Sequence, residues 1–471
     1  MRVGEVAPQI KRIQLPEVFE PEEVPDYSRQ EYLQRISRFR ERLGARGLDF
    51  GVIYADREHS GNLNYFTGIF SPFEETVLVI ARDSGEVYLL SGNEIVDGMV
   101  NLSPILDAMT PIRIQTFSLQ GFFRELAYEN KTLLKDSFKQ IGIGKDSRVG
   151  LIGWKYFEER EIVDHLHQHF VPSVIVDCLR ELASDRNVVN ASDILLNPID
   201  GMRIIHDTHQ LAVVEANSTR LTNIVNRVFE RVEPGMSEVD VARLIEFSGE
   251  HHLYYPIVCI SAERIRLAYA LPSTKYRLTE GEQLFVSLGF GGAAQAREGR
   301  FLEYGEAHQE AAFFQVYEQF FVLKYLWLKN LAIGKSGEEV YQQVQAAYDK
   351  DFIINPGHNI DQYQEWTNSV FRAGDESLLR SGMVFHIDVI TETFNNDTIA
   401  LASEELRQQL AQAYPAAWAR INYRRQYLED VIGLELHESA LPFSDNLLVQ
   451  PFVRSLDYAF VNEAAYHSAK T

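Results

Sequence analysis

The sequence predicts an α+β protein with two domains, a smaller α/β domain at residues 28–195 and a larger domain at residues 196–471. The chain has 471 residues, which is long enough for more than one domain at about 100–200 residues each. Apolar residues make up 45% of the chain and aromatic residues 11%, so that complete hydrophobic cores can form. The order of helix and strand patterns differs between the two parts.

The first part alternates helix and strand patterns after an arm at residues 1–27 that is rich in Pro and Glu and is expected to be extended. A helix is predicted at 27–47, because apolar residues recur at helical spacing and glycines follow them. Strands are predicted at 49–55 and 76–92, the latter with a turn at Asp83–Gly85. Further strands are predicted at 148–153 and 173–178.

The second part opens with two predicted helices within residues 202–250. Pro234 and Gly235 separate them, and Ser237 is expected to cap the second helix, with Asp240 three residues later as an acidic form of the capping box. Later segments follow in the order strand, strand, helix, helix, strand, strand: 256–261, 282–288, 313–334, 337–350, 382–390 and 427–436.

Composition excludes several classes of function. A net charge of −22 repels phosphate backbones and anionic lipids, which argues against nucleic-acid or membrane-surface partners. Residues 1–25 contain no apolar core of signal-peptide length. The apolar segment 313–334 contains Glu318, Lys324 and Lys329, which are costly in hydrocarbon. With Cys178 and Cys259 as two separated thiols, we expect a soluble cytoplasmic protein.

Residues 281–299 are the most informative stretch. The apolar run 284–286 leads into Gly289, Gly291 and Gly292 and then into polar residues. This order is typical of a buried strand that enters a tight hairpin.

Six segments together resemble one known family. They are NLNYFTGI (62–69), VEPGMSEVDVARLIE (232–246), LTEGEQLFVSLGFGG (278–292), PGHNIDQYQEW (356–366), LRSGMVFHIDVI (379–390) and YLEDVIGLE (427–435). In this order they resemble the creatinase and Xaa-Pro peptidase family, which includes aminopeptidase P and prolidase and is grouped with the M24 metallopeptidases. The resemblance covers about residues 30–450 and implies a "pita-bread" catalytic domain. It places the first and last of these segments on strands.

The resemblance also implies a set of site residues. Peptidases of this family hold two divalent metals with two Asp, one His and two Glu, and the metals activate a water and polarise the scissile carbonyl. Carried over in that order, the positions correspond to Ser287, a residue near Glu298, His358, Asp388 and Glu429. The position of the first metal-binding aspartate is therefore occupied by a neutral serine, Ser287. The chain is identified as a divergent member of the family with a degenerate metal site.

Two further positions depart from the family pattern. The histidine that precedes the first aspartate strand corresponds to Tyr269, and the one that follows the Gly-His loop corresponds to Gln364, with Glu365 after it. His251 and His252 are alternative proton carriers, or they simply end a helix.

Metal chemistry of the usual kind is not expected. Four positive charges facing three carboxylates in a pocket of low dielectric leave strong repulsion, so a dinuclear site is disfavoured. We expect no cofactor, or one divalent ion held by the four remaining candidates: Glu298, His358, Asp388 and Glu429.

Three functions remain open. The first is a hydrolase or lyase acting on a small C–N-containing substrate, peptide-like or guanidino/amide, without the dinuclear site. The second is a non-catalytic binding protein of the same fold, and the third is a mononuclear-metal peptidase. In the first, the catalytic residues are His358, Tyr269 and Glu365, and the substrate-binding residues are Asp388, Glu429, Arg297 and Ser287, with Arg300 beside them. The arginines could equally belong to a surface loop.

The partner is a small molecule or short peptide, and a homodimer is expected from the family, with helix 313–333 as an interface or as core.

Overall fold

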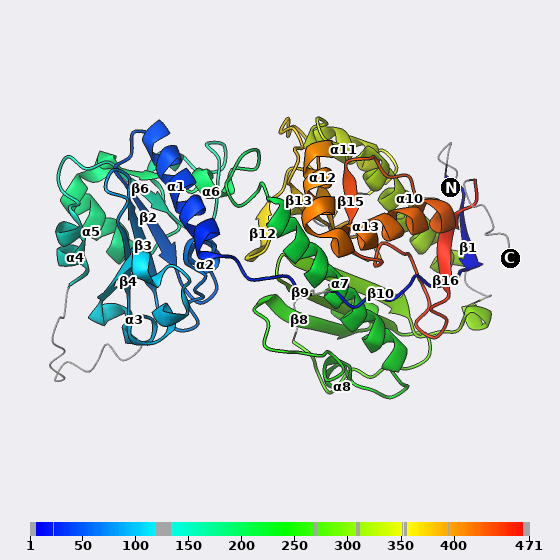
Figure 1. Cartoon of the computed structure of the whole chain (residues 1–471). Helices are drawn as coiled ribbons and strands as arrows, with labels where there is room; N and C mark the ends of the chain where they lie inside the picture. Colours follow the sequence, from blue (N-terminus) through cyan, green and yellow to red (C-terminus); the bar gives the residue numbers. More distant parts are fainter. Residues whose placement is uncertain are drawn as a thin grey trace. The chain divides into compact units, whose positions relative to one another are not determined.

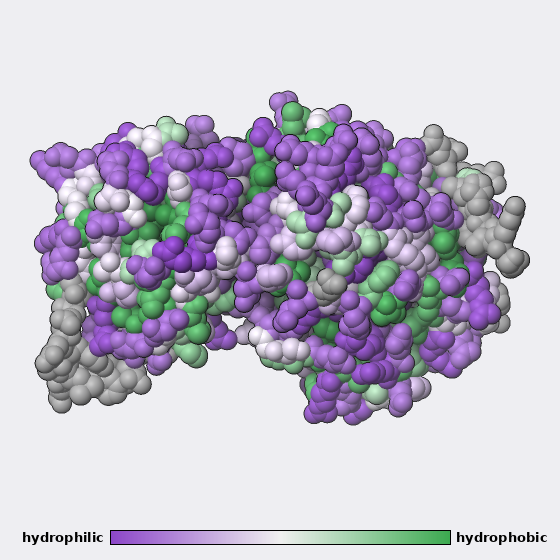
Figure 2. Space-filling model, in the orientation of Figure 1, coloured by the Kyte–Doolittle hydropathy of each residue, from purple (hydrophilic) through white to green (hydrophobic). Residues whose placement is uncertain are grey.

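The computed structural model describes residues 6–21, 23–118, 133–266, 271–307, 311–350, 352, 356–393 and 395–464. It divides into two compact units, one formed by Pro25–Arg203 and the other by Ile204–Thr471 together with the segment up to Val24. The sequence placed the divisions at 28–195 and 196–471. In the view of Figure 2, hydrophilic residues cover most of the surface of each unit, in keeping with the strongly negative net charge.

The unit Pro25–Arg203 is an α/β domain around a mixed six-stranded sheet, in the order β5-β4-β3-β2-β6-β7 (Figure 1). Its strands are β2 (Phe50–Ala55), β3 (Thr76–Ala81), β4 (Val87–Ser91), β5 (Met109–Arg113), β6 (Val149–Ile152) and β7 (Val188–Asn190). Its helices are α1 (Arg29–Ala45), α2 (Gly61–Thr67), α3 (Asn93–Asp97), α4 (Leu134–Ile141), α5 (Ser173–Ala183) and α6 (Asp193–Leu196). The predicted helix 27–47, the hairpin 76–92 and the strand 148–153 are confirmed.

Two predicted strands of this unit are wrong. Residues 173–178 belong to helix α5, whose buried residues Ile175, Val176, Leu179 and Ala183 recur at helical spacing. A short apolar run cannot by itself distinguish a strand from a buried helix. Residues 62–67 lie in helix α2, which ends at Gly68 with φ 73°, a left-handed conformation that favours glycine.

The other unit contains two sheets. Strands β8 (His252–Ile260), β9 (Gln283–Phe290) and β10 (Ala293–Arg300) form one, in the order β10-β9-β8. The second has the order β12-β11-β13-β14-β15, formed by β11 (His358–Asp361), β12 (Gln364–Asn368), β13 (Val384–Ile387), β14 (Asp397–Leu401) and β15 (Ala440–Pro442). An antiparallel bridge between Ala296 and Asn396 connects the two sheets.

Helices cover these sheets (Figure 1). They are α7 (Thr208–Arg231), α8 (Glu238–Ala242), α9 (Ala262–Arg266), α10 (Ala311–Asn330), α11 (Gly337–Gln345), α12 (Glu404–Ala413) and α13 (Pro415–Tyr427). Helix α7 packs on β9 and β10. Ser237 caps α8 and forms the predicted capping box with Asp240. Short 3-10 turns occur at Met99–Leu102, Leu106–Ala108, Gln115–Phe117, His165–His167, Asp185–Asn187 and Tyr304–Ala307.

The aromatic helix α10 lies in the core. Phe320, Phe321 and Trp327 are almost completely buried there. Core packing therefore explains the apolar run that the sequence also allowed as a dimer interface. Among the residues that the structure describes, no helix has the length and apolarity needed to cross a membrane.

Both ends of the larger unit differ from the prediction. Within the predicted arm 1–27, β1 (Pro8–Arg12) pairs with β16 (Tyr458–Asn462), so this segment is the edge of a two-stranded sheet. The predicted strand 427–436 is wrong, because α13 continues into a π-helical turn, η7 (Leu428–Ile432), which ends at Gly433. Leu428 and Ile432 are spaced four apart and both are buried, as on one face of a helix.

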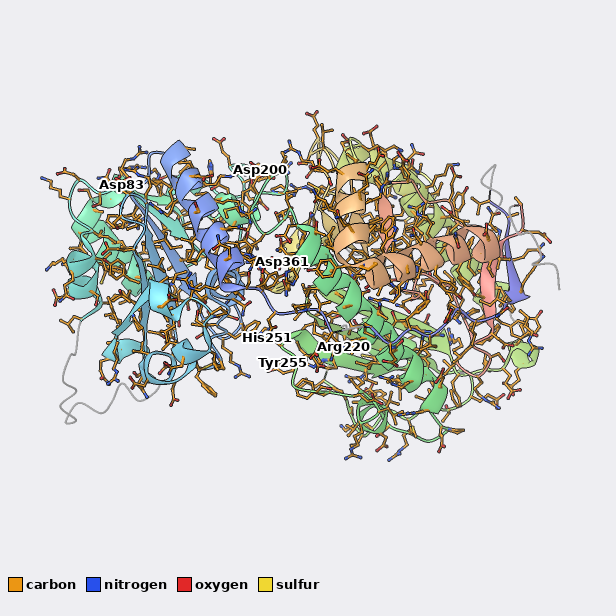
Figure 3. All side chains as sticks on the ribbon, in the orientation of Figure 1. Asp83, Asp200, Arg220, His251, Tyr255 and Asp361 are labelled. Carbon is orange, nitrogen blue, oxygen red and sulfur yellow. The ribbon has the colours of Figure 1, made fainter. Side chains whose placement is uncertain are left out.

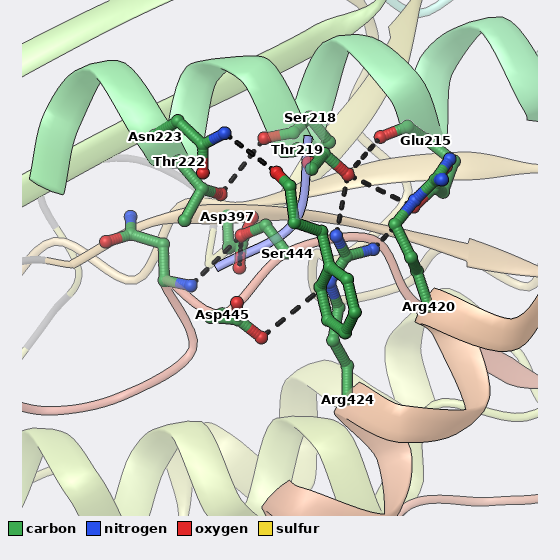
Figure 4. A network of polar contacts seen from close by, with 12 residues as sticks. Glu215, Ser218, Thr219, Thr222, Asn223, Asp397, Arg420, Arg424, Ser444 and Asp445 are labelled. Atoms are coloured by element: carbon green, nitrogen blue, oxygen red, sulfur yellow. Dashed lines mark hydrogen bonds and ion pairs between the residues drawn. The ribbon is translucent and has the colours of Figure 1, made fainter. Parts of the chain in front are cut away.

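A buried ion-pair network fastens α13 to α7 (Figure 4). The carboxylate of Glu215 on α7 accepts two hydrogen bonds from Arg420, at 3.0 and 2.6 Å, and one from Arg424 at 2.6 Å. Arg424 also donates to Thr219, one turn further along α7. The Glu215 side chain is completely buried, so its charge depends on these partners.

We predict that Glu215→Ala destabilises this unit by about 3–5 kcal/mol, because two buried guanidinium groups lose their carboxylate. Urea unfolding followed by circular dichroism measures the loss. Glu233→Gln, at an exposed position just beyond α7, is the matched control and should change stability by less than about 0.5 kcal/mol. Equal effects of the two substitutions would contradict the role given to Glu215.

Candidate functional site

Strand register brings a set of polar side chains to one face of the connected sheets. His358 on β11 pairs with His386 on β13, and His386 pairs with Thr398 on β14. Because directly paired residues and residues two apart share a face, Asp388 lies on this face beside His386, and Asn396 lies beside Thr398. The Nδ2 of Asn396 donates a hydrogen bond to Oδ1 of Asp388.

His358 is the centre of this group. Its side chain is 0% exposed, and its Nε2 lies 3.4 Å from Oε1 of Glu365 and 3.9 Å from Oδ2 of Asp388. Its Nδ1 lies 3.2 Å from the carbonyl oxygen of Asn359. The ring stacks on Trp366 of β12, with centroids 4.0 Å apart and an interplanar angle of 14°. The imidazole is therefore fixed between a ring and two carboxylates.

The residue before His358 must be small. Gly357 has φ 153°, and a Cβ there would lie 3.1 Å from the carbonyl oxygen of His386 and 3.2 Å from the ring of Trp327. A side chain at this position would push strand β11 away from β13. Close packing against His386 and Trp327 therefore explains why a glycine precedes His358.

The protonation equilibria of the group are shifted. Burial raises the pKa of Asp388 to about 7, against the opposing effect of His358. Burial alone would lower the pKa of His358, but the charges of Glu365 and Asp388 raise it above its ordinary value. The side chain of Asp388 is 10% exposed and that of Glu365 is 22% exposed.

The hairpin β9–β10 corrects one predicted position. Its turn consists of Gly291 and Gly292 alone, because Phe290 pairs with Ala293. Ser287 therefore faces Ala296, whereas Glu298 faces Phe285. The position opposite Ser287 is thus occupied by Ala296 and not by Glu298.

Ser287 and Glu298 have separate partners. The hydroxyl groups of Ser287 and Tyr254 lie 2.9 Å apart. Glu298 is buried and accepts hydrogen bonds from Thr393 and from the Tyr317 hydroxyl, which lies 3.0 and 2.9 Å from its two oxygens. Burial raises the pKa of Glu298. No contact among the described residues joins Glu298 to His358.

Glu429 also lies away from the group. It is on the π-helical turn η7, where its carboxylate is 3.0 Å from Arg425, and its side chain is 37% exposed. The residue that completes the group is Asn396, which bridges to Ala296 in the backbone and bonds Asp388 through its side chain. Asn396 could not be predicted once the last ligand position of the family pattern was assigned to Glu429, on a strand expected at 427–436.

The predicted arginines point elsewhere. Arg297 packs on Phe229 of α7, with its guanidinium carbon 4.5 Å from the ring centroid, and donates to Asn226 at 2.9 Å. Burial lowers its pKa to about 10. Arg300 donates to the carbonyl of Gly281. Neither is a surface-loop residue, because both lie on β10.

The remaining candidates have local roles or lie outside the described residues. Tyr269 lies outside them. Gln364 donates to the carbonyl of Trp366 in its own strand. Figure 3 shows His251 near the start of β8. The same figure labels Asp361, the last residue of the strand that begins with His358. Burial lowers the pKa of both His251 and His252, which disfavours their charged forms.

Comparison with known proteins identifies this unit. Residues 216–400 match the family model "Metallopeptidase family M24". This part of the chain belongs to the M24 family. A comparison with curated protein sequences finds no match.

Solved structures of M24 peptidases share the fold. Dipeptidase PepE from Mycobacterium ulcerans has a TM-score of 0.57 at 16% identity, over 80% of this chain and 95% of that one. Xaa-Pro dipeptidase from Bacillus anthracis has a TM-score of 0.56 at 14% identity, over 80% and 96%. A variant of Escherichia coli aminopeptidase P has a TM-score of 0.52 at 14% identity, over 83% and 100%. The predicted α+β, pita-bread architecture is confirmed.

The donor set of this M24 unit does not fit the two divalent metals that the family typically uses. Two adjacent ions need bridging carboxylates to offset their charge. Besides His358, Asp388 contacts the neutral side chain of Asn396, which bridges to Ala296, the residue opposite Ser287. Across the described ranges of the chain, no group of three or more His, Cys, Asp or Glu is placed to hold a metal ion.

We predict that Asp388→Asn changes how stability depends on pH. A carboxyl group whose pKa is raised to about 7 by folding costs stability progressively as pH rises from about 4 to about 7. The variant should therefore gain stability relative to the parent across this window, with a constant difference of up to about 4 kcal/mol above it.

Urea unfolding at pH 4.5, 5.5, 6.5 and 7.5 tests this prediction. Asp177→Asn on the exposed face of α5 is the control and should show no such trend. A difference between Asp388→Asn and the parent that stays flat with pH would show that Asp388 titrates normally.

Proposed function

We propose that the M24 unit is a hydrolase that acts on a small C–N-containing substrate, peptide-like or an amide or guanidino compound, without a dinuclear metal site. One observation carries the proposal. Nε2 of His358 lies within 3.9 Å of the carboxyl groups of Glu365 and Asp388, while the positions that face Ser287 and Asp388 are the uncharged Ala296 and Asn396. The group suits proton transfer better than metal coordination.

The chemistry rests on two carboxyl groups and one imidazole. Since the pKa of Asp388 is about 7, this group is available both as acid and as base near neutral pH. In hydrolysis, water adds to the substrate carbon and gives its proton to one carboxylate. The C–N bond then breaks, and the leaving nitrogen takes a proton from the other carboxyl group. His358 lies between them and exchanges the proton that must be returned after each cycle.

The substrate class follows from the charge of the group. Glu365 and Asp388 are the acidic side chains beside His358, and they favour a substrate that carries a positive amine or guanidinium group. Structural relatives named Xaa-Pro dipeptidase and aminopeptidase P support short peptides with a free amino end as the first class to test. A homodimer and a cytoplasmic location remain part of the proposal, and the free cysteines Cys178 and Cys259 support a reducing compartment.

A second candidate is a binding protein of the same fold. His358 is completely enclosed, and Ser287, the nearest hydroxyl candidate on β9, is paired with Tyr254 instead of with a base. In that case the carboxylates would bind a cationic ligand without turning it over. A mononuclear-metal peptidase is less well supported, because Glu298 and Glu429 are engaged with other residues.

We predict turnover that survives chelation and depends on His358. Xaa-Pro dipeptides, small amides and guanidino compounds are screened with chelator-treated protein whose metal content has been measured. His358→Ala should reduce kcat by at least about 100-fold, because general acid–base catalysis contributes about that much. His165→Ala, in the other unit, is the matched control and should leave kcat unchanged.

The outcomes separate the candidates. Binding of a cationic peptide without turnover would favour the binding protein. Activity that disappears with the chelator and returns with one divalent ion per chain would favour the mononuclear peptidase. Binding of two ions per chain would contradict the inference that the neutral residues Ala296 and Asn396 prevent a dinuclear metal site.

A further inference from the structure

A lysine lies in the core behind the candidate site. Lys324 belongs to the aromatic helix α10 and is 0% exposed. Its ammonium group donates hydrogen bonds to two backbone carbonyls, that of Asn395 at 2.6 Å and that of Leu447 at 3.3 Å. Burying an ammonium group is expensive unless its charge and its hydrogen bonds are compensated, so a lysine here needs an explanation.

The charge has a buried counterpart. Asp397 alternates with Asn396 and Thr398 along β14, so its side chain points to the opposite face from the site. Its carboxylate accepts hydrogen bonds from the hydroxyl of Ser444, on the loop shown in Figure 4, and from the backbone N–H of Thr398. Burial lowers the pKa of Lys324 and raises that of Asp397, while the attraction between the two groups opposes both shifts.

The bonds of Lys324 reach the site through one short segment. Asn395 directly precedes Asn396, whose side chain bonds Asp388 and whose backbone bridges to Ala296. Asn446 donates to the carbonyls of both Ala296 and Asn396, at 3.1 and 2.8 Å. Residues 395–397 are thus held from behind by α10 and by the loop 444–447.

We propose that Lys324 is a positioning residue that holds the strands of the site together from the face of the sheet opposite the site. It does so in place of metal ions, which would connect the strands on the site face. Its ammonium group anchors the carbonyl of Asn395, and this anchor keeps the amide of Asn396 on Asp388. The inference rests on the proposed function, because it assumes a site that works without a dinuclear metal centre.

The test compares Lys324→Met, the double variant Lys324→Met/Asp397→Asn, and the control Lys329→Met, which removes a partly exposed lysine of the same helix. The pKa of His358 is followed by NMR in protein labelled with carbon-13 histidine. In both Lys324 variants, Asp388 loses the fixed amide, holds its proton to higher pH, and no longer supports the charge of His358. The pKa of His358 should fall by about one unit, as expected for one lost hydrogen bond. Lys329→Met should leave it unchanged.

Stability separates positioning from general damage. Lys324→Met leaves Asp397 buried without its cation and should lower the urea midpoint, whereas the double variant should recover most of this loss. The proposal requires the fall in the pKa of His358 to persist in the double variant. A pKa that recovers together with stability, or that never changes, would overturn it. If Lys324→Met does not fold, the double variant carries the test.

Activity is a separate readout. A parent protein without turnover would reject the proposed hydrolase, while the titration of His358 would still report on Lys324. A parent with turnover and an unchanged pKa in the Lys324 variants would reject the positioning role alone.

Discussion

The backbone bridge between Ala296 and Asn396 is the constraint on which the site depends. The two residues exchange both of their hydrogen bonds, at 3.2 and 2.8 Å, and so connect the three-stranded sheet to the five-stranded one. The side chain of Asn446 binds both carbonyls and fixes the junction from the side. Without this connection, Ser287 on one sheet and Asp388 and His358 on the other would have no common face.

The junction explains why so few charges meet in this M24 unit. A two-residue turn sets the register of β9 and β10, and that register places alanine opposite Ser287. The bridge then places asparagine beside Asp388. Neutral residues at these two places leave one imidazole between two carboxyl groups, and burial tunes the pKa of Asp388 toward neutrality.

Much of the fold could be predicted from local patterns. The strand and glycine turn at 281–299, the Ser237 cap and the aromatic helix 313–334 all depend on residues close in sequence. The site itself was predicted less well. The structure brings His358, Glu365 and Asp388 together, whereas Glu298 and Glu429 have other partners. The neighbours of Glu298 depend on the length of one turn, because the two-residue turn at Gly291 and Gly292 puts Ala296 opposite Ser287. The position of Glu429 depends on how distant segments pair, which no local pattern reveals.

Lys324 shows how one residue changes meaning with context. In the sequence its charge mattered only because it makes helix 311–330 unsuitable for a membrane. In the fold the same charge satisfies two carbonyls on the segments that enclose the junction and is attracted by Asp397, whose side chain lies on the same face of β14. Glu215 with Arg420 and Arg424 does the same for α7 and α13. The buried charges of this unit are thus compensated by other side chains of the unit. A site that is held together without metal ions is consistent with this pattern.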